Sequence, residues 1–96
     1  MTKAYWVSAY HEVRDTEKLA AYAKLAGPAI AEAGGTFLAR GTASKAYEAG
    51  LLERTVIVEF PSLQAAEDCH DGPAYQAALE ALGDAVTRDL RVVEGA

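Results

Sequence analysis

Residues 67–71 read Glu67-Asp68-Cys69-His70-Asp71 and place the one cysteine of the chain beside a histidine and three acids. This segment has three interpretations: a metal site, a cysteine nucleophile with its base, or a polar helix end. In a helix, Glu67, His70 and Asp71 share one face, but Cys69 points about 100° away from His70. Zinc motifs have longer and more regular spacing, and a free cysteine is usually buried and inert. We therefore expect a solvated helix end, with no metal or other cofactor bound.

His70 also lies on the same helical stripe as Leu63 and Ala66, which would turn its ring inward toward a sheet. A histidine that lines a cavity between a helix and a sheet can act as a general base near neutral pH. The structural alternative is a core histidine held by hydrogen bonds. His70 is the first candidate catalytic residue, in the role of base.

Arg40 falls inside a predicted strand, where a side chain that stays charged needs an anionic partner or a route to water. It could hold a carboxylate or an enolate through a bidentate fork, and Gly41 leaves space beside it. The alternative is an ion pair with Glu59 on an adjacent strand. Arg40 is the second candidate catalytic residue, in the role of anion clamp.

Other residues are candidates for substrate binding. Arg54 offers the same alternatives as Arg40, at the start of its own strand. Ser8 is a lone hydroxyl in an apolar strand and could hydrogen-bond a ligand, although a backbone partner is the usual case. The aromatic residues that could line a pocket for a planar ligand, or instead form core or interface, are Tyr5, Trp6, Tyr10 and Tyr75.

The composition defines the class of protein in which these residues must work. The 96 residues suit a single domain spanning 1–96, and 51% hydrophobic with 24% charged residues is ordinary for a folded chain. The net charge of −5, with Lys and Arg scattered along the chain, argues against a nucleic-acid partner. Because the chain has neither a signal-like start nor an apolar run of roughly 20 residues, we expect a cytoplasmic protein without a membrane partner.

Hydrophobic periodicity predicts the elements that position these side chains. Strands are predicted over 4–11, 36–42, 52–60 and 90–94, and helices over 16–33 and 62–82, the second with a pause at 71–73. Asp15 and Ser62 are placed to cap the two helices. Pro28 should bend or break the first helix near residues 24–27. The order β-α-β-β-α-β predicts an α+β, ferredoxin-like fold with an antiparallel four-stranded sheet.

The two strands expected at the centre of this sheet are apolar on both faces. Neither Tyr5-Trp6-Val7 nor Val56-Ile57-Val58 alternates between apolar and polar residues, as a sheet with one wet face should. Two helices cover only one face of a four-stranded sheet. We therefore expect a homodimer that forms through the other face.

Four segments carry a family resemblance: Tyr5-Trp6, Phe37-Leu38-Ala39-Arg40-Gly41, Arg54 with Val56-Ile57-Val58-Glu59-Phe60-Pro61-Ser62, and Pro73-Ala74-Tyr75-Gln76. On these segments the chain resembles, from about residue 3 to residue 95, the uncharacterised domain of unknown function numbered thirteen-thirty, in the dimeric α/β-barrel superfamily. The resemblance implies a homodimer whose two sheets face each other as a barrel. Relatives in the wider superfamily include small monooxygenases that work without metal or flavin, muconolactone isomerases and haem-binding enzymes. The family itself has no established reaction.

Two functions remain open at this point. One is an enzyme with a small-molecule pocket, in which Arg40 and His70 serve cofactor-free proton abstraction or oxygenation of a small carboxylate, enol or phenol. The other is a non-catalytic dimeric module that binds a metabolite or serves a stress response. The catalytic version requires the side chains of Arg40 and His70 to open into one cavity.

Overall fold

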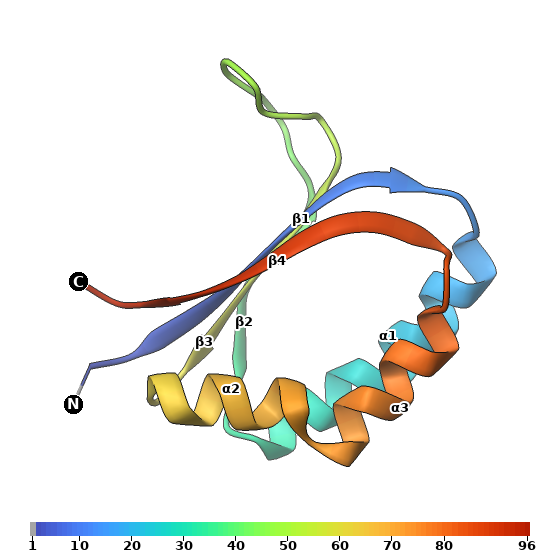
Figure 1. Cartoon of the computed structure of the whole chain (residues 1–96). Coiled ribbons are helices and arrows are strands. Elements are labelled where there is room, and N and C mark those ends of the chain that lie inside the picture. Colours follow the sequence, from blue (N-terminus) through green and yellow to red (C-terminus); the bar gives the residue numbers. More distant parts are fainter. Residues whose placement is uncertain (1) are drawn as a thin grey trace.

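The computed structural model describes residues 2–96 and contains a four-stranded antiparallel sheet with helices on one side (Figure 1). The strand order is β2-β3-β1-β4. The elements, in chain order, are β1 (Ala4–Val13), α1 (Thr16–Glu32), β2 (Thr36–Thr42), β3 (Arg54–Phe60), α2 (Leu63–Asp71), α3 (Pro73–Leu82) and β4 (Val86–Glu94). This arrangement confirms the predicted α+β, ferredoxin-like fold, with its second helical region divided into α2 and α3. Among residues 2–96, no helix is both long and apolar enough to cross a membrane.

The predicted helix caps are present. The Asp15 carboxylate accepts hydrogen bonds from the backbone N–H groups of Glu17 and Lys18, both at 3.0 Å. The Ser62 hydroxyl accepts one from the backbone N–H of Ala65 at 3.1 Å. Each cap satisfies N–H groups that the first turn of a helix leaves free, so these two residues fix where α1 and α2 begin.

The expected break at Pro28 is absent, because α1 runs from Thr16 to Glu32 without interruption. Proline normally clashes with the Cβ of the residue before it, and Gly27 has no Cβ. Pro28 and Lys24 are also exposed, so water can hydrogen-bond the Lys24 carbonyl that loses its helical donor. The predicted break is therefore wrong, and Gly27 removes one part of the steric conflict. The predicted bend near residues 24–27 stays a prediction.

The predicted last strand was too short. β4 begins at Val86 rather than at residue 90, and it pairs with β1 along most of its length, from Ala4↔Glu94 to Val13↔Val86. This part of the strand was missed because three consecutive polar residues, Thr87, Arg88 and Asp89, interrupt the apolar pattern that indicates a strand. β3, in turn, starts at Arg54 rather than at residue 52.

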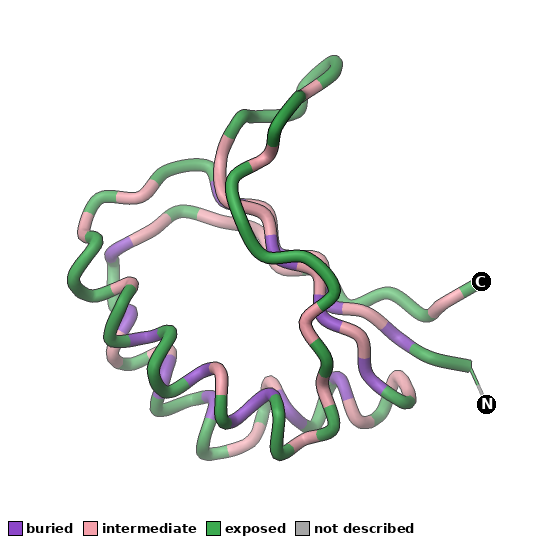
Figure 2. The backbone as a smooth tube through the Cα atoms, turned by 180° about the vertical axis from the view of Figure 1, so that it is seen from behind, coloured by how far each residue is buried: buried purple, intermediate pink, exposed green. Residues whose placement is uncertain are grey.

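The two faces of the sheet have different surroundings. The helix-facing residues of β1 and β3 form the core with α1, α2 and α3, and the largest of them are Trp6, Val58 and Phe60. The opposite, open face has no helix over it (Figure 1) and carries Tyr5, Val7 and Ile57, all partly exposed. Buried and intermediate positions alternate along the central strands (Figure 2). An uncovered apolar centre of this kind is the feature from which the dimer was predicted.

Candidate functional site

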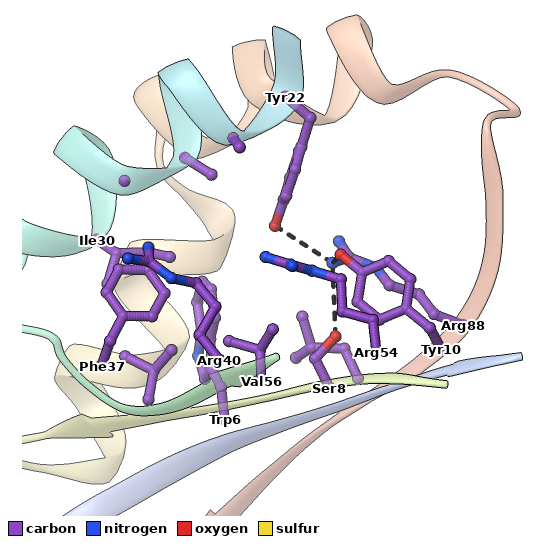
Figure 3. Close-up of a pocket in the computed structure, with 15 residues that line it drawn as sticks. Trp6, Ser8, Tyr10, Tyr22, Ile30, Phe37, Arg40, Arg54, Val56 and Arg88 are labelled. Carbon is purple, nitrogen blue, oxygen red and sulfur yellow. Dashed lines mark hydrogen bonds between the residues drawn. The ribbon is translucent and has the colours of Figure 1, made fainter. Parts of the chain in front are cut away.

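A cavity lies between α1 and the helix-facing side of the sheet (Figure 3). It contains about 450 Å³ of empty space, with its open mouth included. All four strands contribute polar or charged side chains to it, whereas α1 contributes mainly small or apolar ones. The lining residues are Trp6, Ser8, Tyr10, Tyr22, Ala23, Ala26, Gly27, Ile30, Phe37, Arg40, Arg54, Val56, Val58, Arg88 and Leu90.

The strand register places the charged residues of the cavity in two rows. Tyr10 pairs with Arg88 across β1 and β4, and Arg54 stands on the other side of Tyr10, its guanidinium carbon 5.8 Å from the ring centroid. In the next row Arg40 pairs with Val56. Arg40 turns away from the first row, and its guanidinium carbon lies 4.3 Å from the centroid of the Phe37 ring. The guanidinium groups of Arg40 and Arg88 therefore lie at opposite ends of the cavity (Figure 3).

Arg88 is the centre of a cluster of hydroxyl groups. Its Nη1 donates to Tyr10 at 3.1 Å, to Tyr22 at 3.2 Å and to Ser8 at 3.5 Å. Its Nη2 donates to the Tyr75 hydroxyl at 3.0 Å. The Tyr22 and Tyr75 hydroxyls are 2.6 Å apart and share a further hydrogen bond. Four hydroxyl oxygens, from β1, α1 and α3, therefore face one guanidinium.

The cluster remains positively charged. Burial lowers the pKa of Arg88, but the neighbouring hydroxyl groups of Tyr22, Tyr75 and Tyr10 raise it by more, so its pKa ends above the ordinary value. Burial also raises the pKa of Tyr75, and Tyr22 adds to this effect while Arg88 opposes it. At neutral pH the Arg88 guanidinium is thus charged and the Tyr75 phenol beside it is protonated.

The charge of the cavity is not balanced by any acid. Its lining, as far as residues 2–96 define it, contains the guanidinium groups of Arg40, Arg54 and Arg88 and no carboxylate. The Nε of Arg54 is buried and has no hydrogen-bond partner in the described chain. A buried donor without a partner costs about 1–3 kcal/mol, and a protein of net charge −5 had many acids that could have provided one.

The ion pair considered for Arg40 is not formed. Glu59 lies on the open face, where its carboxylate accepts from the Lys3 ammonium at 3.1 Å and from the Tyr5 hydroxyl at 3.4 Å. Arg40 pairs with Val56, which is three positions before Glu59 on the adjacent strand. Because successive strand residues alternate between faces, Arg40 and Glu59 point to opposite faces of the sheet. Arg40 is therefore available to a ligand.

The structure gathers some of the predicted site residues and separates others. Arg40, Arg54 and Ser8 line the cavity, and Tyr75 reaches its Arg88 end through the hydroxyl group. Tyr5 lies on the open face of the sheet, away from the cavity. The residues that sequence reasoning missed are Arg88 and Tyr22.

His70 does not share the cavity with Arg40. Its ring, on α2, packs against Trp6 and Tyr75 with centroids 6.0 and 5.3 Å apart, and its Nδ1 lies 3.1 Å from a carboxylate oxygen of Asp71. Trp6, whose Nε1 donates to the Ala66 carbonyl at 3.0 Å, lines the cavity while His70 does not. The side chains of Arg40 and His70 therefore do not open into one cavity, as the predicted catalytic pair would require.

The polar segment 67–71 forms the last turns of α2, and its side chains have different surroundings. Among residues 2–96, no three His, Cys, Asp or Glu side chains are grouped closely enough to hold a metal ion. Asp68 accepts a hydrogen bond from Gln64 at 2.8 Å on the exposed side of α2. Cys69 is buried, with its Sγ 3.9 Å from the Ala29 carbonyl.

Cys69 should react very slowly with alkylating reagents in the native protein. Burial raises the pKa of its thiol to about 11, and the thiolate is the reactive form. Since the raised pKa favours the neutral thiol in the fold, protection should hold below pH 9 and fade as the pH rises through 11. At pH 8, iodoacetamide should modify the native chain ~100-fold or more slowly than the unfolded chain, as measured by mass spectrometry. Equal rates in buffer and in urea would contradict this.

The comparisons with known proteins agree with the fold. The family model described as a domain of unknown function, DUF1330, matches residues 3–96. The chain belongs to the DUF1330 family. No curated protein matches this DUF1330 chain.

Solved structures resemble this DUF1330 protein over nearly its whole length. Methylated RPA0582 protein superposes with a TM-score of 0.77 at 19% identity, over 99% of this chain and 82% of the other. RPA0582, a protein of unknown function from Rhodopseudomonas palustris, gives 0.71 at 19% identity, over 97% and 80%. A dimeric ferredoxin-like protein of unknown function from Thermobifida fusca gives 0.53 at 13% identity, over 99% and 91%. At these identities the likeness establishes the fold alone.

Proposed function

We propose that this DUF1330 protein binds a small organic anion, a carboxylate, enolate or phenolate on an apolar body, in the cavity under α1. The observation that carries the proposal is the absence of any acid, within the described lining, beside Arg40, Arg54 and Arg88. A ligand oxygen would provide the partner that the buried Nε of Arg54 lacks. Arginine forks suit carboxylates in particular, because two parallel N–H groups match the two oxygens.

The walls of the cavity suit the apolar part of such a ligand. Trp6 and Phe37 supply aromatic surface, and Ile30, Val56 and Leu90 supply aliphatic surface. Binding sites for small molecules commonly combine apolar walls with a few polar groups that fix orientation. Ser8, Arg54 and Tyr75 keep the substrate-binding roles predicted for them, Tyr75 through Arg88. Arg40, predicted as a catalytic residue, is proposed here as a binding residue, and Tyr5 and His70 are left out of the proposed site.

We further propose that the protein works as a homodimer in the cytoplasm. The open face supports the dimer, because Tyr5, Val7 and Ile57 form an apolar centre between the polar groups of Glu59 and Arg91. One structural neighbour, the Thermobifida fusca protein, is itself dimeric. The cytoplasmic location rests on the composition of the chain.

Catalysis by Arg40 with His70 is not proposed, because the two side chains do not share a cavity. Turnover of the bound ligand at the Arg88 end, by proton abstraction or by cofactor-free oxygenation, is the second candidate. The specific observation in its favour is the group of donors around Arg88, which is suited to a developing oxyanion. In the first step the O–H bond of a bound enol or phenol would break, leaving its electron pair on the oxygen while the proton passes to water. A bound nitrophenol whose absorbance stays that of the neutral form would contradict this role.

Binding should be measurable by calorimetry with benzoate as probe and benzamide, its uncharged analogue, as control. We expect benzoate to bind and benzamide not to bind. Arg54→Gln should weaken benzoate binding by ~10-fold or more, since a hydrogen bond to a charged group contributes about 1.5–3 kcal/mol. Ala23→Trp, at an exposed position of the cavity mouth, should block binding without removing any charge.

Two outcomes would overturn the proposed function. One is equal binding of benzoate and benzamide, which would mean that charge is not recognised. The other is full benzoate affinity in Ala23→Trp, which would place the anion outside the cavity. Circular dichroism of both variants provides the check on folding.

A further inference from the structure

We infer that the ligand of this cavity carries two acceptor groups, one at each end of a short rigid body, and that the natural ligand class is a dicarboxylate or a carboxylate with a distal enolate or phenolate oxygen. The inference rests on the proposed function and adds to it the number and spacing of the anionic groups. It depends on the separation of the guanidinium groups and on the direction of the hydrogen bonds around Arg88.

The cavity has two cationic ends. Arg54 and Arg88 lie against the ring of Tyr10, with guanidinium carbons 5.8 and 5.4 Å from its centroid. Arg40 comes from the next row of the sheet and leans further along it, over Phe37. The Arg40 guanidinium therefore lies away from Arg88 along the sheet (Figure 3). A ligand with an acceptor group at each end can contact both ends of the cavity at once.

The space between the two ends is apolar. Val56 pairs directly with Arg40, and its side chain supplies apolar surface beside that arginine (Figure 3). The small residues Ala26 and Gly27 of α1 also line the cavity. A Cβ added at Gly27 would meet nothing within 4 Å outside its own helix turn and neighbours. This arrangement leaves room for a planar or aliphatic spacer between two charged groups.

The Arg88 end offers hydrogen-bond donors to a ligand. The hydroxyl oxygens of Ser8, Tyr10 and Tyr22 all accept from Arg88, which leaves their hydrogens available. Tyr75 is 1% exposed and does not line the cavity, so its hydroxyl hydrogen has a partner only if it is donated to Tyr22. The hydrogen of Tyr22 is then free to point at a ligand. A second acceptor oxygen satisfies these hydroxyl groups and the guanidinium together.

The test compares four benzene carboxylates by calorimetry on the whole protein. Terephthalate has carboxylates at opposite ends of the ring, phthalate has the same charge with adjacent carboxylates, and benzoate and monomethyl terephthalate have one carboxylate each. We expect terephthalate to bind at least ~10-fold more tightly than the other three. Arg40→Gln should remove this advantage, so that terephthalate binds the variant no more tightly than benzoate does.

The outcomes separate this inference from the proposed function. If terephthalate binds no better than benzoate or phthalate, the two-ended ligand is excluded while anion binding stands. If none of the four carboxylates binds, both proposals fall. If Arg40→Gln weakens benzoate and terephthalate by the same factor, Arg40 belongs to the first binding end and the assignment of two ends is overturned.

Discussion

The Ile57→Asp variant should lose the dimer and give, at micromolar concentration, a light-scattering mass near 10.2 kDa instead of twice that value. Ile57 lies on the open face, paired with Val7 on one side and Ala39 on the other. A face of this size would bury on the order of 800 Å² per partner, and a carboxylate at its centre would lose its water without gaining a partner. If folding needs association, the variant should also unfold at a lower temperature, and the wild-type midpoint should rise with protein concentration.

The same substitution at the neighbouring residue Val58 should destabilise the fold itself. Val58 is 1% exposed and points into the core beside Trp6, so Val58→Asp should cost about 5 kcal/mol or more and leave no cooperative unfolding transition. Leu25→Asp is the matched control, because Leu25 is an apolar residue of α1 that is 46% exposed. It should remain dimeric. An Ile57→Asp protein with the wild-type mass and midpoint would exclude the open face as the interface.

The Arg88→Met variant should fold but lose ~100-fold in affinity for terephthalate. Arg88 is the donor to Ser8, Tyr10, Tyr22 and Tyr75, and two charge-assisted hydrogen bonds to a ligand correspond to about 3 kcal/mol or more. Its effect on folding should be small, within about 1 kcal/mol, since an apolar side chain of similar length avoids burying a charge that no acid neutralises. Calorimetry and urea denaturation measure the two quantities.

Arg91→Met is the control on the same strand. Arg91 is exposed on the open face and its Nε lies 3.2 Å from the Asp89 carboxylate, so its loss should leave terephthalate affinity unchanged. If both arginine variants weaken binding equally, the effect is one of overall charge. If Arg88→Met keeps wild-type affinity, Arg88 does not contact the ligand.

The fold was largely accessible from the sequence because its signals are local. Strand β3 has a run of β-branched residues, and Asp15 and Ser62 cap their helices through side chains only two or three residues away. The split between α2 and α3 at Gly72 was predicted for the same reason. The Pro28 error arose where a second residue, Gly27, changed the steric consequence of the first.

The candidate site was only half accessible because it depends on strand register. Arg40 and Arg54 were found as charged residues in or beside apolar strands. Arg88 was missed because Asp89 and Arg91, which belong to the other face, made this segment resemble a loop. Its spacing of two from Leu90 was the usable signal, since alternate residues of a strand share a face. The position of His70 behind Trp6 depends on tertiary packing that no local pattern contains.

The charged groups of the cavity come from the sheet, and the wall that faces them comes from the helix α1. Arg40, Arg54 and Arg88 stand on three different strands, whereas Ala23, Ala26 and Gly27 come from α1. Substitutions on α1 would therefore change which ligand body fits, while substitutions on the strands would change which charges are recognised. The two properties can therefore change separately among related chains. Under the proposed function, few substitutions would be enough to move this site from one organic acid to another.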